Sequence, residues 1–473
     1  MTRLLSLALA DGLALVLVLF SAAAAVAADD APRPTPVTRP AMKRMLEGMK
    51  TRQERIPLPD LTDAEKAAAA EEPTALLYEN RLRALYLPGT ELRGYLGFGG
   101  TAPKRPNAPP PKVVIEPDPA VTLDYGFKTR LFWIASRVNN CQYCLGHQES
   151  KLLAVGMTDD DLARLDTDWS GFPENEQAAF TLARKLTLAP GSITDADIDR
   201  CLLHFSGKEI LEIALSVGGN NAINRWKEGI GVAQAGNGGN SGWAQAGSNG
   251  DHSYLTPTDN RFDTIASAVA ILSSAKPGDD LVATAPPTPL PSAEEIAVGL
   301  ATARSRSARL PLVDETEARR ILGALAPEGP LPHWLRLLAN FPLAGTRMVK
   351  AFELTAEAPG LSPVDRARIA WTVARRNRAW YALGLAEECL RSFGADDAAI
   401  ADLAGDQRQL SAAERAMLVV ADRLAASPVI CTDADFETAL RATSPATMVH
   451  VVHAVAMDSL FDRFTEAAGL TLE

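Results

Sequence analysis

The chain has 473 residues, more than one hydrophobic core usually serves, and 47% of them are apolar, so we expect two domains. Its 47 Lys and Arg residues stand against 58 Asp and Glu residues, which gives a net charge of −11, and no polybasic block occurs. This charge balance argues against nucleic acid as a partner.

The N-terminal segment 1–28 has the layout of a signal peptide. It carries an early Arg3, a mostly apolar stretch that ends near Phe20, and a run of small residues resembling a cleavage site. We therefore predict removal near Ala28 and a secreted or periplasmic protein. The alternative is an uncleaved membrane anchor, since the apolar stretch approaches spanning length if the alanines are counted. Export would place the thiols in an oxidising compartment, where neighbouring cysteines tend to form disulfides.

Pro- and Gly-rich segments divide the rest of the chain. We predict a surface insertion at 101–120 and a linker region at 233–292. Elsewhere the sequence is rich in Ala, Leu, Glu and Arg, and its apolar residues recur at spacings of three and four. This period is typical of helices. The sequence therefore predicts an all-α fold with two tandem helical domains, at 42–232 and 293–473.

The two predicted domains are related by an internal repeat. A shift of 238 positions aligns 133–232 with 371–470 without a gap, and 28 of the 100 pairs are identical. The tract TDAD occurs in both copies, at 194–197 and 432–435. In each tract the Thr and the Asp three residues later have the spacing of a capping box at a helix start. The similarity indicates a duplicated domain.

The copies differ where the first one carries reactive groups. The tract NNCQYCLGHQE contains Cys141, Cys144 and His147, and the second copy has Ala379, Ala382 and Leu385 at these places. Packing alone therefore does not require sulfur or imidazole at these positions. A chemical site of this kind is expected in the first copy.

The spacing of this trio favours redox chemistry. The apolar pattern around the motif predicts a helix, on which Cys141, Cys144 and His147 follow one stripe at steps of three. Two sulfurs at such a spacing can form and break a disulfide with little backbone motion. A nearby histidine favours the reactive thiolate, as an ion-pair partner or as the base that takes its proton.

Two other interpretations remain open. The pair can be a permanent structural disulfide. It can also bind zinc, because Cys201 and His204 are three apart on a predicted helix and would complete a tetrahedral set of three Cys and one His. The second copy lacks these two residues as well, having Ala439 and Ala442.

The region resembles the alkylhydroperoxidase D-like, carboxymuconolactone decarboxylase family. The resemblance is carried by WIASRVNNCQYCLGHQESKLLAVG, by ENEQAAFTLARKLT, by the TDAD start and by the late pair Asn224–Arg225. It covers 125–232, and 363–470 resembles a degenerate copy. It implies all-α domains of that type, which assemble into oligomers, and a thiol peroxidase in which Cys144 attacks a hydroperoxide and Cys141 resolves the product.

The resemblance also implies the partners. The substrate would be a small hydroperoxide, the electron donor an unidentified thiol or dithiol, and neither a cofactor nor a metal would be required. The second copy would pair with the first inside one chain, or the chain would form a homo-oligomer. Two positions depart from the family pattern, because Gln148 stands where the family has His and Thr129 stands where it has Glu.

Overall fold

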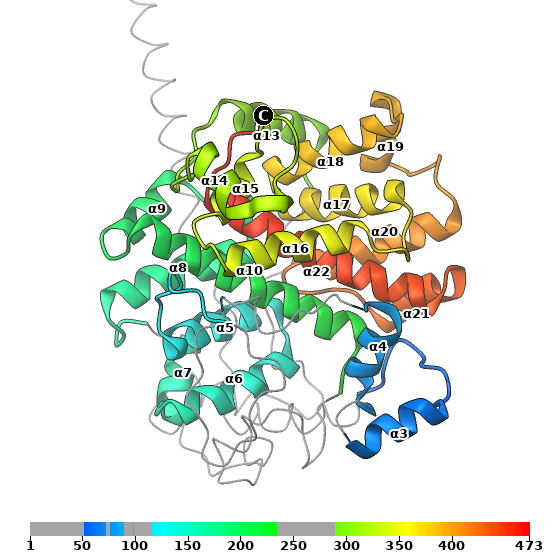
Figure 1. Cartoon of the computed structure of the whole chain (residues 1–473), viewed down its shortest axis with the longest axis horizontal. Coiled ribbons are helices and arrows are strands. Elements are labelled where there is room, and N and C mark those ends of the chain that lie inside the picture. Colours follow the sequence, from blue (N-terminus) through cyan, green and yellow to red (C-terminus); the bar gives the residue numbers. More distant parts are fainter. Residues whose placement is uncertain (1–51, 72–75, 89–97, 99–115, 168, 234–288) are drawn as a thin grey trace, which may run out of the picture. The chain divides into compact units, whose positions relative to one another are not determined.

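Helices are the only regular secondary structure in the part of the chain that the structure describes. The computed structural model describes residues 52–71, 76–88, 98, 116–167, 169–233 and 289–473 (Figure 1). No strand occurs among them, so the all-α prediction is confirmed. None of their helices has both the length and the apolarity needed to cross a membrane.

Several predicted segments lie outside the described residues. These are the signal peptide 1–28, most of the insertion 101–120 and most of the linker region 233–292. All described residues belong to one compact unit of the chain.

The helices of the two copies begin 238 positions apart. In the first copy they are α5 Tyr125–Asn139, α6 Gln142–Ala154, α7 Asp159–Thr167, α8 Glu174–Leu188, η4 Pro190–Ser192, α9 Asp195–Leu202 and α10 Gly207–Ile230. In the second copy they are α17 Pro363–Asn377, α18 Trp380–Ser392, α19 Asp397–Ala404, α20 Ala412–Ala425, α21 Asp433–Ala442 and α22 Pro445–Ala467.

Further helices precede each set. Before the first are α3 Asp63–Glu71 and α4 Tyr78–Tyr86. Before the second are α13 Ala293–Ser305, α14 Glu315–Leu322, η7 Gly323–Leu325, α15 His333–Leu338 and α16 Ala344–Ala356.

The predicted capping boxes start α9 and α21. The backbone N–H of Thr194 donates to Asp197 Oδ2 at 2.7 Å, and that of Thr432 donates to Asp435 Oδ2 at 2.9 Å. In both boxes the threonine side chain in return accepts the backbone N–H of the aspartate. The local prediction is confirmed, since each pair satisfies backbone donors that a helix start leaves open.

The long helices α10 and α22 join the two copies. Figure 1 shows α10 (green) and α22 (red) side by side. Glycine allows this close approach: a Cβ on Gly218 would lie 2.8 Å from Leu460 Cδ1, and one on Gly229 would lie 2.5 Å from Val452 Cγ1. Real Cβ atoms do not approach other atoms so closely, so a larger residue would force the helices apart.

Two buried arginines cross this contact reciprocally. Arg225 on α10 donates to the carbonyl of Ala425 at 2.8 Å, and Arg463 on α22 donates to the carbonyl of Thr187 at 2.9 Å. These four residues form two pairs at the repeat spacing of 238. The copies therefore contact each other through equivalent residues, as the subunits of a twofold dimer do.

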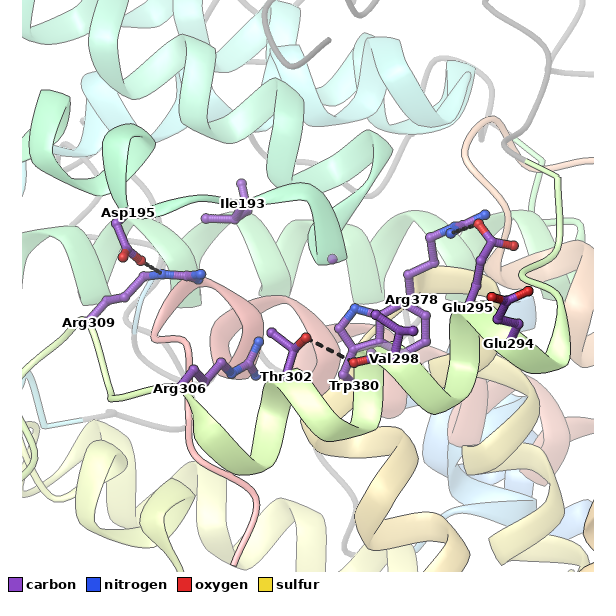
Figure 2. A pocket seen from close by; sticks show the side chains of 12 residues that line it. Ile193, Asp195, Glu294, Glu295, Val298, Thr302, Arg306, Arg309, Arg378 and Trp380 are labelled. Atoms are coloured by element: carbon purple, nitrogen blue, oxygen red, sulfur yellow. Dashed lines mark hydrogen bonds and ion pairs between the residues drawn. The ribbon is translucent and has the colours of Figure 1, made fainter. Parts of the chain in front are cut away.

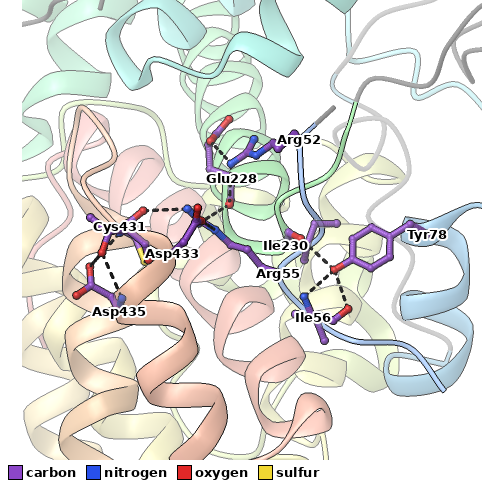
Figure 3. Close-up of polar contacts among 10 residues, drawn as sticks. Arg52, Arg55, Ile56, Tyr78, Glu228, Ile230, Cys431, Asp433 and Asp435 are labelled. Atoms are coloured by element: carbon purple, nitrogen blue, oxygen red, sulfur yellow. Dashed lines mark hydrogen bonds and ion pairs between the residues drawn. The ribbon is translucent and has the colours of Figure 1, made fainter. Parts of the chain in front are cut away.

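One arginine also binds near the C-terminal end of each long helix, in a contact that we call an arginine clamp. Arg309 bonds to Asp195 at 2.6 Å (Figure 2) and donates to the carbonyl of Glu466. Arg55 bonds to Asp433 at 2.7 Å and donates to the carbonyl of Glu228 (Figure 3). The partners correspond at a spacing of 238, whereas the arginines are 254 apart. The gapless comparison of the sequence did not detect this clamp.

Candidate functional site

The two cysteines lie at the start of α6. The helix begins at Gln142, so Cys144 is in its first turn and Cys141 is the N-cap residue. Asn140, the C-cap residue of α5, directly precedes Cys141 and has the left-handed conformation at φ 58°. The predicted helix is confirmed from Gln142 onward. The single stripe holds for Cys144 and His147, because Cys141 precedes the helix.

Cys141 and Cys144 form a disulfide, with their Cα atoms 5.4 Å apart. Both are buried, with exposed fractions of 0% for Cys141 and 4% for Cys144. The N-terminal end of a helix carries partial positive charge, which stabilises a thiolate when the bond is reduced. Of the two sulfurs, that of Cys144 therefore has both the greater exposure and the place in the first helical turn.

His147 lies one turn after Cys144 on the same helix. Its ring is half-buried, and its centroid is 4.5 Å from that of Tyr143. Burial, together with the charges of Lys227 and Lys151, lowers the pKa of His147 to about 3. The imidazole is therefore neutral at physiological pH. This environment opposes an imidazolium–thiolate pair, and so low a pKa makes the imidazole a weak base for a thiol proton.

A charged cluster from α4 and α10 covers this part of α6. Lys227 Nζ lies 4.6 Å from the centroid of the Tyr143 ring and forms an ion pair with Glu79. The Glu79 carboxylate also pairs with Arg83 at 3.0 Å and accepts the indole N–H of Trp226 at 2.7 Å. The cluster thus brings a carboxylate to the surroundings of the cysteine pair from outside the repeat.

The pKa shifts in the cluster show that the ion pair outweighs burial. Burial opposes ionisation of Glu79, but Lys227 and Arg83 lower its pKa to about 2. Burial and the charge of Lys227 lower the pKa of Lys151 to about 8. For Lys227, burial is offset by Glu79, and its pKa is raised. Glu79 and Lys227 are therefore both charged at neutral pH.

Neither Glu79 nor Lys227 was found from the sequence. Glu79 lies outside the aligned repeat, so the comparison of the copies does not reach it. Lys227 does have a detectable signal: it is a charged residue in an apolar helix, and the second copy has Thr465 at its place. The comparison that identified the cysteines would have identified this lysine too.

The two family positions that depart from the pattern make structural hydrogen bonds. The Thr129 hydroxyl donates to the carbonyl of Tyr125 at 2.8 Å, within its own helix. The Gln148 amide donates to Asn220 Oδ1 at 3.0 Å, and both side chains are buried. Beside Thr129, Lys128 forms a fully buried ion pair with Glu212.

The structure does not bring Cys201 and His204 to the cysteine pair. The Cys201 thiol is buried and lies 3.8 Å from the carbonyl of Ala178, to which it donates. Burial raises the pKa of that thiol to about 12. Among the residues that the structure describes, no three His, Cys, Asp or Glu side chains come together as metal ligands would. The geometry thus gives the zinc interpretation no support.

A cavity of about 620 Å³ lies between the two copies, where the N-terminal end of α18 and helix α13 face Ile193 and Asp195 of the first copy (Figure 2). Trp380 of α18 and Val298 of α13 form apolar parts of its wall. Its guanidinium groups already have carboxylate partners, as Arg309 pairs with Asp195 and Arg378 with Glu295. The lining therefore indicates no particular class of ligand, and the cavity lies beside the helix that has lost the cysteines.

Comparisons with known proteins add no assignment, since no protein-family model and no curated protein matches the chain.

Proposed function

We propose that the first copy is a thiol peroxidase of the alkylhydroperoxidase D-like type, and that the second copy is its degenerate tandem partner. The observation that carries the proposal is the Cys141–Cys144 disulfide at the start of α6, beside His147. It is supported by the second copy, which keeps the same helices and has Ala379, Ala382 and Leu385 instead.

The reaction begins with the dithiol form. The Cys144 thiolate attacks the terminal oxygen of a hydroperoxide, the O–O bond breaks, and the alkoxide takes a proton from water and leaves as an alcohol. Cys144 is then a sulfenic acid. The Cys141 thiol attacks its sulfur, a disulfide forms, and water leaves. An external thiol or dithiol returns two electrons and two protons to restore the starting state.

We assign the supporting roles in this reaction to groups around α6. The first turn of the helix stabilises the Cys144 thiolate. His147 stays neutral, and we give it the role of orienting the thiol as a hydrogen-bond acceptor, because its pKa of about 3 is too low for it to remove the thiol proton, which passes to water. Lys227, paired with Glu79, places its ammonium group near the Tyr143 ring, and Glu79 brings a carboxylate near α6 where the family position holds Thr129.

The proposal includes export and the partners that follow from it. The protein would act outside the cytosol on a small hydroperoxide, with a thiol or dithiol donor from that compartment. The second copy would occupy the place of a partner subunit. The reciprocal contacts of Arg225 and Arg463 support this arrangement.

Stopped-flow oxidation of the reduced full-length protein tests the peroxidase. With cumene hydroperoxide, the unaltered chain should oxidise rapidly, and Cys144→Ser should lose the reaction. Cys141→Ser should still react and accumulate a sulfenic acid that dimedone traps. Cys389→Ser is the matched control, since Cys389 is an exposed cysteine of the second copy. Equal rates for the unaltered chain and Cys144→Ser would remove the assignment.

A second candidate is a non-enzymatic helical module with a permanent disulfide. The burial of both sulfurs favours it, because an oxidant or reductant needs access to the bond. Equilibration with glutathione separates the two functions. A structural bridge should stay oxidised at the potentials of the glutathione pool, whereas a redox pair should be reduced and re-formed reversibly.

A further inference from the structure

A network of buried polar side chains surrounds the turn before the cysteine pair. Asn139 is the last residue of α5, two positions before Cys141, and it is fully buried. Its amide group donates to Asn221 Oδ1 at 2.8 Å and to Asn224 Oδ1 at 2.9 Å. Its oxygen accepts the hydroxyl of Ser427 at 2.8 Å. Both donors and the acceptor of this side chain are thus used, and the acceptor's partner comes from the second copy.

Ser427 lies between α20 and α21 and is itself held from both sides. Arg225 donates to Ser427 Oγ at 2.8 Å and to Asn221 Oδ1 at 2.9 Å. The backbone N–H of Val429 donates to the carbonyl of Asn139 at 3.4 Å. The segment 425–429 therefore fixes both the side chain and the backbone of Asn139.

The same network holds α6 beyond the second cysteine. Gln148, one turn after Cys144, donates to Asn220, and Asn220 donates to Ser136 Oγ at 3.1 Å. Asn224 donates to the same hydroxyl at 3.1 Å. Buried polar networks of this kind specify one arrangement because each unmade bond is costly. The cysteine pair is therefore held on both flanks by a network that Ser427 helps to complete.

The second copy has no equivalent of the Ser427 bond. There Asn377 donates to Asp462 Oδ2 at 2.7 Å, a bond within the copy. Ala189 stands opposite Ser427 in the repeat and carries no hydroxyl. The copy without cysteines thus donates this hydrogen bond to the copy that has them, and Ala189 cannot donate a reciprocal one.

From this asymmetry we infer that Ser427 is a positioning residue for the Cys141–Cys144 pair, so that the second copy completes the site of the first. The inference rests on the proposed function only in taking the pair to be redox-active. Without the hydroxyl, Asn139 and Arg225 each lose a buried hydrogen bond, and the turn at Asn140 is held less firmly. The two sulfurs then meet less often, and the disulfide becomes less stable relative to the dithiol.

The test is the equilibrium between dithiol and disulfide in the full-length chain, measured in dithiothreitol redox buffers. We expect Ser427→Ala to lower the equilibrium constant for disulfide formation three- to tenfold, which corresponds to a potential about 14 to 30 mV less negative. Ser427→Thr keeps the hydroxyl and should restore the potential. The matched control is Ser459→Ala, because Ser459 is a buried serine of the second copy whose hydroxyl has no hydrogen bond to the described residues.

A second measurement separates this inference from the proposed function. Hydrogen exchange of the Cys141 and Leu145 amides reports on the turn in the oxidised protein, without reduction. These amides bond to Ser136 and Cys141 carbonyls at 3.0 Å. Exchange at least threefold faster in Ser427→Ala than in Ser459→Ala supports positioning even if the pair proves irreducible, which would end the peroxidase proposal alone. Equal exchange and equal potentials in the two variants overturn the inference.

Discussion

The surroundings of α6 and α18 differ more than the helices themselves. Ala379 caps α18 at φ −86° and ψ 87°, and Cys141 caps α6 at φ −84° and ψ 89°. Around α6 the structure places the Glu79–Lys227 ion pair. Around α18 it places an aromatic cluster with ring centroids 5.3 to 6.3 Å apart, made of Trp334, Phe352, Tyr381, Phe461 and Phe464.

The difference shows that the scaffold does not require the charges. Where the first copy has Trp226 and Lys227, the second has Phe464 and Thr465, and the two helices still begin at equivalent positions. Apolar packing takes the place of the Glu79–Lys227 pair at these positions, and the ion pair near α18 is a different one, Arg306–Glu466. The scaffold of the repeat therefore does not depend on a charge at the place of Lys227.

The largest expected effect comes from moving the cysteines between the copies. Ala379→Cys/Ala382→Cys, combined with Cys141→Ala/Cys144→Ala, should form a disulfide because the two helix starts have the same geometry. Oxidation by cumene hydroperoxide should be at least ~100-fold slower than in the unaltered chain, since α18 has Leu385 in place of His147 and lacks the Glu79–Lys227 pair.

Thiol titration and stopped-flow fluorescence measure the two parts of this prediction. Ala379→Cys/Ala382→Cys with the first copy intact is the control for folding, and it should retain the full rate. A transplanted pair that reacts as fast as the original would mean that the surroundings of α6 contribute nothing.

Removing the cation of the charged cluster should have the next largest effect. Lys227→Met leaves the Glu79 carboxylate with one fewer partner in a largely buried site, so we expect a loss of about 2 kcal/mol in the free energy of unfolding. Glu79→Gln/Lys227→Met should recover part of it. Urea unfolding at pH 7 measures both. A loss as large in the double variant as in the single one would contradict the electrostatic explanation.

Acid should weaken the same pair. The pKa of Glu79 is about 2 in the folded protein against 4.5 when unperturbed, so its contribution is present above pH 4.5 and is lost as the pH falls from there toward 2. Glu79→Gln should remove this part of the acid dependence.

The two arginine clamps should contribute equally to the free energy of unfolding. Arg55→Ala and Arg309→Ala each remove an ion pair and a bond to the carbonyl at the same place of a long helix. We expect each to lower the free energy of unfolding by about 1 kcal/mol, since the carboxylate partners are exposed. Thermal unfolding of the two variants measures both losses. Clearly unequal losses would show that the copies rely on the clamp differently.

The smallest effect should distinguish His147 from His453. His147 and His453 both have pKa values of about 3, chiefly because of burial, and each has Leu as its counterpart in the other copy. A lowered pKa means that the unfolded state binds the proton first, so stability falls as the pH drops below about 6.5. Between pH 7 and 6 each histidine should account for ~0.7 kcal/mol of that loss.

His147→Leu and His453→Leu should each remove this share, as urea unfolding at the two pH values would show. Only His147→Leu should slow the reaction with hydroperoxide. A reaction that is equally slow in both variants would assign the effect to stability and not to the site.

Local features of the fold could be predicted from the sequence. The period of apolar residues gave the helices, and the capping boxes at Thr194 and Thr432 were found because their bonds join residues three apart. The disulfide was within reach for the same reason, since Cys141 and Cys144 are close in sequence whatever the rest of the chain does.

The parts that could not be predicted depend on contacts between distant segments. Glu79 meets Lys227 across 148 positions, and Ser427 meets Asn139 across 288. The burial of Cys144 likewise depends on the segments that pack over α6, and the sequence of α6 itself does not reveal which segments these are. The clamp of Arg55 was missed because its spacing to Arg309 is 254, and a gapless shift of 238 does not align them.

The reciprocal arginines have a consequence for how the molecule can vary. In a symmetric homodimer, one gene encodes both faces, so any substitution at the contact appears twice. Here Arg225 and Arg463 are separate codons, as are Thr187 and Ala425 beneath them. Each face of the contact is thus free to mutate alone, and covalent linkage keeps both faces together at any dilution.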